Sequence, residues 1–576
     1  MIMKKKIKNN HGVITIMISL MLTGILSLGT MVIEAGRLQG ARTQLDDANL
    51  SAGTSMIASY NTALYERYGL LAIDNNMFNV GRYREYIDFN SDRTAGYRGN
   101  NISTFYTVKT VELEGLYNLT YPAVMKRQLT SRAKYNIIPQ DYSLNYYNMN
   151  YFIADYQSKC SYVSDALQSV ASGSAIQGTL DDIPTDMESA LKNMYSIFSE
   201  IRKYDDAYNV TIKSSDMSLL PSNTGSIEHS VNSDDIEAIN DAVSDANTVL
   251  GVDGDLLVSN NGSSYSEIDV NVNTAFASNF INELADVNKI SEKAVNITAD
   301  CRAMVQGINA ALNMLAADSE GTLLLNSYIA GYFPNKNCAL EKYVGVKPGT
   351  ATPDIDNAAF SGACVEYVFS GNSSEVLNQQ NAYDYIIATR LVNNLYSIIT
   401  SSSCFNAENA TSVVSHIAWA YYETCADVEL LFKYNAVVPM SKADMIFSIN
   451  DVSNVNSALS SKDFSEIMKN LGILHDDTFD IKGYDTTNYR DALAFALWFV
   501  PNSQKMLRVA DLIQLEMRYK EQHIENGTPA FLISNQNTFC RVKCIGNLNS
   551  VLPVISLSTG NEVKGTPIQS IKYIGY

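Results

Sequence analysis

The strongest hydrophobic pattern lies near the N-terminus, where the segment 13–33 (VITIMISLMLTGILSLGTMVI) contains no charged side chain. At a rise of 1.5 Å per residue, a helix of that length crosses the roughly 30 Å hydrocarbon core of a bilayer. The basic leader 1–12 carries four lysines and no acid, which predicts that it stays in the cytoplasm and that the chain after Glu34 lies outside. A cleaved signal peptide is the alternative, but its one passable site, 27–29, is followed by further apolar residues, so we expect a retained anchor.

The helical pattern continues beyond the apolar run. Apolar positions repeat at intervals of 3, 4, 3 and 4 and form a narrow stripe of Leu38, Ala41, Leu45, Ala48 and Ala52. No proline precedes Pro122, and the first strong stop is Gly69, a residue suited to the left-handed position after a helix. The pattern therefore predicts one helix of about 84 Å, with a transmembrane part 13–33 and a stalk part 34–68. The stripe should be buried, while Arg42 and Asp46 should face water.

Small residues recur on this helix at a spacing that favours close helix–helix contact. The hydroxyl residues Thr15, Ser19, Thr23 and Ser27 form a slanted ridge within the span, and Gly36 and Gly40 add a small step just outside it. Together with Ala41, Ala48 and Ala52 they are the candidate helix-association residues. The alternative is that the hydroxyl groups bond to carbonyl groups of their own helix.

The rest of the chain predicts an α+β fold, with a mostly helical extracytoplasmic head that contains an antiparallel sheet. Strand character appears at 105–113, 117–121, 538–557 and 568–576, and helical character at 123–138, 276–317, 376–400, 409–434, 462–472, 489–499 and 503–521. The predicted regions are a mixed strand and helix part 69–205, a Ser- and Asn-rich insertion or linker 206–270, a helical head 271–527 and C-terminal strands 528–576. The strands of 105–121 could offer the stalk its hydrophobic partner.

Charge and motifs exclude several functions. A net charge of −19 and a pI near 4.7 argue against nucleic acid as a partner. The sequence has no H-E-x-x-H zinc motif, no G-x-S-x-G nucleophile elbow and no phosphate-binding loop. The nearest approaches to a metal-binding D-x-S-x-S motif, at 141–145 and 451–455, lack its third residue, and 253–255 is more typical of a turn than of a calcium site. We therefore predict no catalytic, metal-binding or cofactor-binding residue.

Other side chains that could carry chemistry have structural explanations. His416 precedes an apolar helix and is expected to be a packing residue. Arg508 and Asp511 are three positions apart on a helix, where an exposed pair would add only a few tenths of a kcal/mol. The eight cysteines would all lie outside the membrane, which leaves disulfides open; Cys540 and Cys544 on one strand would be roughly 13 Å apart and could not bridge each other.

The N-terminal pattern resembles that of the TadE/TadG-like proteins of Tad (Flp) pilus assembly. The residues that carry this resemblance are His11-Gly12, the apolar run, and EAGRLQGARTQLDDANLSA at 34–52. The remainder is similar to uncharacterised membrane-anchored proteins of Gram-positive bacteria, in segments such as 65–74, 364–371, 390–396, 416–442 and 507–518. Met17 stands where prepilins of this class have a Glu five positions after the processed Gly, so cleavage after Gly12 is left open.

The resemblance implies a non-enzymatic, single-pass, surface-facing component of a Tad-like pilus or secretion apparatus, similar to a pseudopilin or minor pilin. Its expected partners are the membrane and other subunits of the apparatus, with self-association left open. Two alternatives stay open: a permanently anchored surface or adhesion protein, and a membrane-tethered hydrolase of cell wall or glycans. Convergent carboxylates in a pocket would favour the hydrolase.

Overall fold

The computed structural model describes most of the helices and strands that the pattern predicts. The described residues are 11–91, 106–136, 146–174, 220–223, 290–315, 319–337, 362–403, 405–433, 438–439, 486–521, 531–548 and 566–576. The predicted linker 206–270 lies outside them except for 220–223, and so does the predicted helix 462–472. The chain divides into two compact units. Unit 1 contains the described residues up to Tyr121 and from Ser534, and unit 2 those from Pro122 to Ile533.

Unit 1 is built on an antiparallel sheet whose central strand comes from the C-terminal region. Strand β5 (Gln536–Leu548) pairs with β2 (Tyr106–Asn118) along one edge, from Tyr106↔Leu548 to Asn118↔Asn537. Along its other edge it pairs with β6 (Thr566–Gly575) and with the short β1 (Ile73–Asp74). The alternation along β5 sets the two faces, because Cys540, Val542 and Cys544 point into the core while Arg541 and Lys543 point outward.

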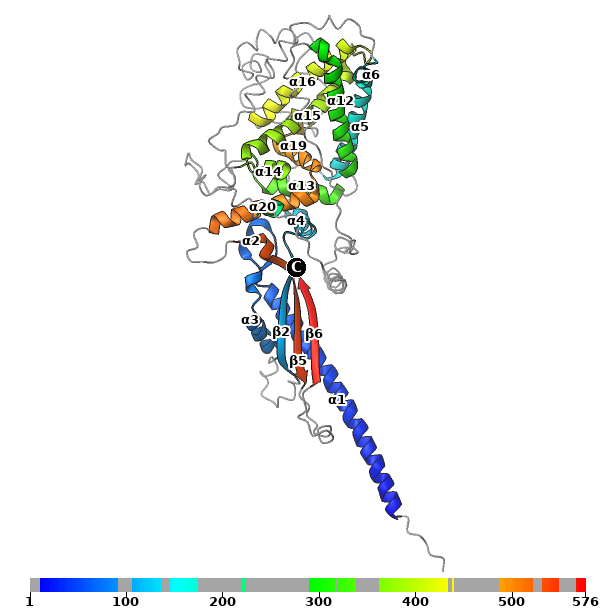
Figure 1. The fold of residues 1–576 in the computed structure, drawn as a ribbon, viewed down its shortest axis with the longest axis vertical. Helices are drawn as coiled ribbons and strands as arrows, with labels where there is room; N and C mark the ends of the chain where they lie inside the picture. Colours follow the sequence, from blue (N-terminus) through cyan, green and yellow to red (C-terminus); the bar gives the residue numbers. More distant parts are fainter. Residues whose placement is uncertain are drawn as a thin grey trace, which may run out of the picture. The chain divides into compact units, whose positions relative to one another are not determined.

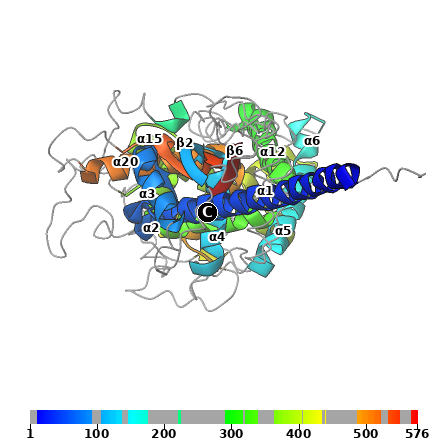
Figure 2. The same cartoon turned by 90° about the horizontal axis from the view of Figure 1, so that it is seen from below.

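Helix α1 (His11–Ile57) runs unbroken from the apolar segment onto this sheet. Its second half packs against β5, β6 and α3 (Val80–Ser91), and Figures 1 and 2 show it beside these elements in two views. Val111 and Tyr106 of β2 join the same core. The sheet therefore supplies the hydrophobic partner expected for the stalk, mainly through the C-terminal strands and to a smaller extent through β2. Tyr106–Asn118 form one strand, where the sequence pattern had suggested two strands within 105–121.

The stalk helix is shorter than predicted. Helix α1 ends at Ile57, and a separate helix α2 (Thr62–Tyr68) follows after a turn. The side chain of Asn61 caps α2 by accepting a hydrogen bond from the Leu64 N–H at 3.1 Å, and Gly69 ends it with φ 72°. The predicted stop at Gly69 is therefore correct for α2. The break at 58–61 was missed because it contains no Pro or Gly, and Asn61 was its one local signal.

The described part of unit 2 is helical, apart from a two-stranded ladder of β3 (Val438–Pro439) and β4 (Thr486–Thr487). Its longer helices are α4 (Pro122–Asn136), α5 (Tyr146–Ala166), α12 (Ile290–Leu315), α13 (Ser319–Tyr332), α15 (Glu375–Ser401), α16 (Ala410–Lys433) and α20 (Asn502–Glu521). The shorter helices α6 (Gln168–Ala171), α14 (Cys364–Ser370) and α19 (Tyr489–Ala496) pack among them, and α19 continues as the 3-10 turn 497–499. The predicted helices at 376–400, 409–434 and 503–521 are confirmed, with ends that differ by one position at most.

The α+β class is confirmed, but the sheet belongs with the N-terminal helix and not with the helical part of the head. The predicted mixed region 69–205 divides at Tyr121–Pro122, with its first part in unit 1 and its second part in unit 2. The sequence did not reveal this division for a simple physical reason. Strand β2 pairs with β5, which follows the whole of unit 2 in the sequence, and no local pattern announces a pairing of that range.

Candidate functional site: the N-terminal helix

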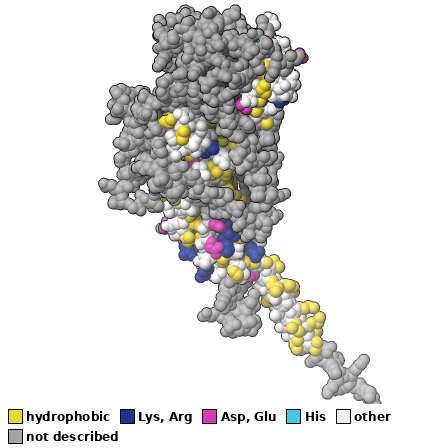
Figure 3. All heavy atoms as spheres, turned by 45° about the horizontal axis from the view of Figure 1, so that its top comes forward, with side chains coloured by type: hydrophobic (Ala, Val, Ile, Leu, Met, Phe, Trp, Pro, Cys, Tyr) yellow, Lys and Arg dark blue, Asp and Glu magenta, His cyan; other side chains and the backbone are white. Residues whose placement is uncertain are grey.

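The first half of α1 exposes an unbroken apolar surface. Its Leu, Ile, Val and Met side chains between Val13 and Ile33 are 54–72% exposed. Figure 3 shows this part of the helix without charged side chains. Among the described residues, this helix alone is long and apolar enough to cross a membrane, with a mean hydropathy of 2.2 in its most apolar window. Burying so large an apolar surface is favourable only against lipid or another protein.

The hydroxyl ridge lies on this exposed half. Thr15, Ser19, Thr23 and Ser27 are all exposed, and the Thr23 hydroxyl donates a 2.8 Å hydrogen bond to the Ser19 carbonyl. This is the alternative to helix association, in which a hydroxyl group bonds to a carbonyl group of its own helix. It satisfies the Thr23 hydroxyl within its own helix, so a role of the ridge in helix association stays a prediction.

The end of the apolar run is marked by an ion pair. Arg37 donates to Glu34 with 2.8 Å between Nη1 and Oε2, and both side chains are partly covered. Gly36 and Gly40 lie beside this pair, and a Cβ added to either would meet nothing within 4 Å. The small step they form is therefore not used for packing within the described chain and is open to a partner.

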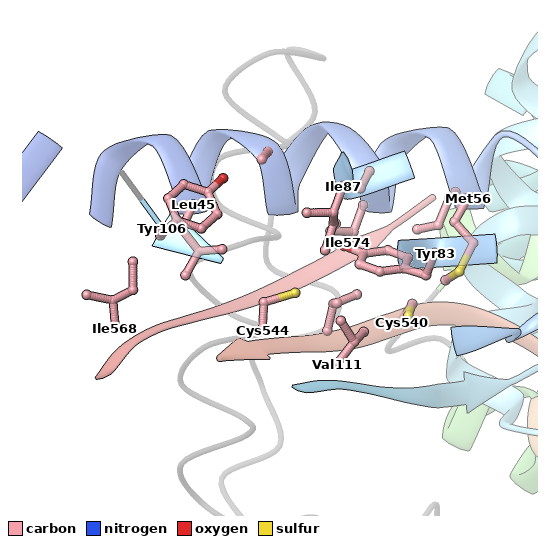
Figure 4. Packing of buried hydrophobic residues seen from close by; sticks show 14 of the residues in the cluster. Leu45, Met56, Tyr83, Ile87, Tyr106, Val111, Cys540, Cys544, Ile568 and Ile574 are labelled. Atoms are coloured by element: carbon pink, nitrogen blue, oxygen red, sulfur yellow. The ribbon is translucent and has the colours of Figure 1, made fainter. Parts of the chain in front are cut away.

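The predicted stripe on the second half of α1 is buried, except that its first residue, Leu38, is only partly buried. Ala41, Leu45 and Ala52 are 0% exposed and Ala48 is 5% exposed, and Met56 extends the stripe by one turn. Figure 4 shows Leu45 near Tyr106, and Met56 near Tyr83, on this face of the sheet. Small side chains allow the helix to lie close to the strands, because each Cβ occupies little of the gap.

Gly53 marks a close approach of helix and sheet, and sequence reasoning missed it. A Cβ added there would lie 1.9 Å from the Ile574 Cδ1 and 3.5 Å from the Tyr83 hydroxyl. Its position directly after Ala52 placed it next to the stripe, so a glycine within a helix pattern was the available signal.

A buried amide at Asn49 ties three elements together. Its Nδ2 donates to the Ser570 Oγ of β6 at 3.0 Å, and its Oδ1 accepts from the Tyr83 hydroxyl of α3 at 2.8 Å. The Cys544 thiol of β5 also donates to this Oδ1, at 3.1 Å. Burial raises the pKa of Tyr83, and it raises that of Cys544 to about 12, so both stay protonated and able to donate. No sequence pattern pointed to this network, since its members come from opposite ends of the chain.

The water-facing side of the stalk differs from the prediction at one position. Arg42 is exposed, but the Asp46 carboxylate lies 3.8 Å from the Lys572 ammonium of β6. Both side chains are a third or more exposed, so the pair contributes at most about 1 kcal/mol. Asp46 is therefore an edge contact of the helix with the sheet and not a neutral surface position.

Unit 2 contains buried carboxylates, the groups that would favour a hydrolase if they lined a pocket. Glu366 is 0% exposed, and its Oε1 accepts hydrogen bonds from the Lys336 N–H at 3.0 Å and the Tyr489 hydroxyl at 2.7 Å. Burial raises its pKa to about 7, against the opposing effect of these donors. Glu375 is also 0% exposed, and its Oε1 accepts from the N–H groups of Gly362 and Ala363. Glu366 therefore holds α14 to its packing partners, and Glu375 binds the backbone directly before α14, so each carboxylate has a structural role.

Arg508 and Asp511 are not the exposed pair that their spacing suggested. Asp511 is 0% exposed and accepts from the Tyr367 hydroxyl at 2.7 Å, and burial raises its pKa to about 6. Arg508 donates to the carbonyl groups of Val368 and Phe369, at 2.8 and 2.5 Å, and so closes the C-terminal end of α14. Each side chain therefore holds helix α14 to α20.

The remaining candidates also have structural roles. The two ring nitrogens of His416 lie 2.9 Å from the Ser402 Oγ and 2.6 Å from the Ser412 carbonyl, and burial lowers its pKa, as expected of a packing residue. The side chains of Cys160, Cys301, Cys540 and Cys544 are buried free thiols. Cys338 and Cys404 lie outside the described residues, as does the turn at 253–255. The part of the chain that the structure describes has no cluster of three or more His, Cys, Asp or Glu able to hold a metal.

Comparison with known proteins gives one match. Residues 271–544 match a protein family described as a family of unknown function (DUF5702). The matched stretch contains the helices of unit 2 from α12 onward and part of β5, and it is less than half of the chain. No curated protein and no solved structure matches the chain. Because the match leaves out residues 11–52, the resemblance of that segment to TadE/TadG-like proteins stays a prediction.

Proposed function

We propose that this chain is a non-enzymatic, single-pass membrane protein whose bulk faces outward, and that it serves as a structural component of a Tad-like pilus or secretion apparatus. The observation that carries the proposal is that the two halves of helix α1 have different surroundings. The first half of α1 is apolar and exposed, and the second half is fixed to a sheet by small residues and a buried amide. A subunit with this arrangement is held in the bilayer by the same helix that forms the spine of its folded part.

Two further observations support an outward orientation and an assembly role. The leader before the apolar run carries four lysines, which favours its retention in the cytoplasm. The open surface at Gly36 and Gly40 leaves room for a second helix to approach closely where α1 emerges from the apolar run. The partners expected at that surface are other subunits of the apparatus.

One observation favours the second candidate, a permanently anchored surface protein. Met17, 56% exposed, stands at the position where processed pilins carry a Glu. An unpaired carboxylate in a bilayer is costly, and in filaments it is used to pair with a neighbouring subunit. Without it, the helix still anchors the chain, but it lacks that contact for entry into a filament core.

Protease treatment of intact protoplasts, followed by mass spectrometry of the membrane-bound remnant, tests both candidates. The outward orientation predicts a protected fragment that ends near Glu34. A remnant beginning at Met1 would favour the permanent anchor, and one beginning after Gly12 would favour processing. Protection of the whole chain would contradict the proposed topology.

A further inference from the structure

The chain leaves unit 1 and returns to it at one end of one strand pair. Strands β2 and β5 remain paired up to Asn118↔Asn537, and the Leu119 N–H then donates to the Gln536 carbonyl at 2.9 Å. Of the residues that the structure describes, those from Pro122 belong to unit 2, and those from Ser534 belong to unit 1 again. This is the geometry of a β-hairpin in which unit 2 takes the place of the turn.

Unit 1 closes this end of the sheet with its own side chains. The Gln536 amide nitrogen donates to Asp74 at 2.7 Å, and the Asn537 amide nitrogen donates to Asn75 at 2.6 Å. The Thr538 hydroxyl donates to the Tyr117 carbonyl at 2.6 Å. Gln536 and Thr538 are 0% exposed, so these bonds are shielded from water. Both strands are therefore fixed at the point where the chain leaves unit 1.

Among the described residues, the core of unit 1 is formed by unit 1 itself. Every buried residue of the cluster beneath α1 comes from residues 41–111 or 540–574. The described hydrogen bonds of the network at Asn49 likewise join α1, α3, β5 and β6. Because hydrophobic burial is the main stabilising contribution to folding, a unit that encloses its own hydrophobic core should fold without the other unit.

We infer that unit 1 is a self-sufficient anchoring module and that unit 2 is an insert carried by its β2–β5 hairpin. The inference rests on the proposed function, and it assigns the membrane and assembly contacts to unit 1. The chain leaves the sheet at the end near Asn118, whereas the apolar half of α1 extends from the opposite end, near Tyr106 and Leu548. The insertion point is therefore at the end of unit 1 that is remote from the apolar half of α1.

The test uses the full-length chain with a specific protease site, flanked by short Gly/Ser linkers, between Tyr121 and Pro122 and another between Ile533 and Ser534. After both cuts in isolated membranes, the fragment 534–576 should stay with the membrane-bound fragment ending at Tyr121, and unit 2 should be released by a salt wash. Chains carrying either site alone are the controls, and in these unit 2 should stay attached. The inference is overturned if 534–576 is released together with unit 2, or if unit 2 stays on the membrane after both cuts.

A second measurement covers the case in which the inserted sites prevent folding. In the otherwise unmodified chain, Ala48→Lys should abolish hydrogen-exchange protection in β2, β5 and β6 and leave α15 and α16 protected. An Asp427→Ala change, which removes the carboxylate 2.6 Å from the Arg390 guanidinium, should do the reverse. Loss of protection in both units from either change would show one cooperative unit and overturn the inference. If the chain is not found in membranes at all, the anchoring function fails, while the pairing of 534–576 with the N-terminal fragment can still be measured in solution.

Discussion

Replacing Ala48 by Lys tests the burial of the stripe most sharply. Ala48 is 5% exposed and lies between two fully buried positions of the stripe, Leu45 and Ala52. A lysine there adds a long side chain to a packed site, which typically costs about 1–3 kcal/mol, and it buries an ammonium group, which costs several kcal/mol more. The sum, roughly 3–6 kcal/mol, is comparable with the whole stability of a small domain. We therefore expect unit 1 of the Ala48→Lys variant to lose its cooperative structure.

The matched control is Ser51→Lys, on the same helix and exposed. It introduces the same side chain and should change the unfolding free energy of unit 1 by no more than about 0.5 kcal/mol. Denaturant unfolding of both variants in detergent, followed by hydrogen exchange of β5 and β6, measures the difference. Equal stability of the two variants would mean that the stripe packs on nothing and would refute the assignment of α1 as the spine of unit 1. Asp46 is a poorer control because of its contact with Lys572.

Three further predictions concern single groups. Asn49→Leu should lower the unfolding free energy of unit 1 by roughly 1–3 kcal/mol, because Ser570 and Cys544 lose the side chain they bond to, while the Tyr83 hydroxyl keeps the Asn49 carbonyl as an acceptor. Adding Ser570→Ala should recover part of the loss, and a double-mutant cycle without coupling would contradict the network. Gly53→Val should destabilise unit 1 by about 1–3 kcal/mol through its clash with Ile574. Gly40→Val, with open space around it, should be neutral or slightly stabilising, because valine has a higher helix propensity than glycine; similar thermal shifts for both would argue against the close approach. Burial raises the pKa of Glu366 in the folded state from 4.5 to about 7, so the unfolding free energy of unit 2 should be highest below about pH 4.5 and should fall by about 3 kcal/mol as the pH rises toward 7 and this carboxyl ionises. Glu366→Gln should abolish this fall in a pH series of unfolding measurements, and an unchanged slope in that variant would exclude the assignment.

Local periodicity was enough to predict the main features of α1. The apolar run and the 3, 4, 3, 4 stepping report which face of a helix avoids water, and burial of Ala41, Ala48 and Ala52 follows from that alone. The same reasoning found α4, α12, α15, α16 and α20 of unit 2, but it did not find α5 or α13 as helices. The end of α1 at Ile57 was missed because the turn that follows depends on Asn61, a cap and not a helix-breaking residue.

Features that depend on distant partners were beyond this reasoning. Asn49 looks like any polar residue on a helix until Ser570 and Cys544 are brought to it by strands from the other end of the chain. Arg508 and Asp511 looked like a surface pair because their spacing says nothing about α14, which packs against both. The hairpin that receives unit 2 was hidden for the same reason, since its two strands flank the whole helical sequence of that unit.

The central claim is that one helix lies in the bilayer with its first half and packs on the sheet with its second half. Single-cysteine scanning along α1 in native membranes, with a membrane-impermeant maleimide and the unmodified chain as background, tests it most directly. The account predicts no labelling at Leu20, Leu22 and Leu26, labelling at Ser51 and Thr54, and no labelling at Ala48 and Ala52 until the protein is unfolded. Labelling of the three leucine positions in folded, membrane-bound protein, or equal labelling of Ala48 and Ser51, would contradict the claim.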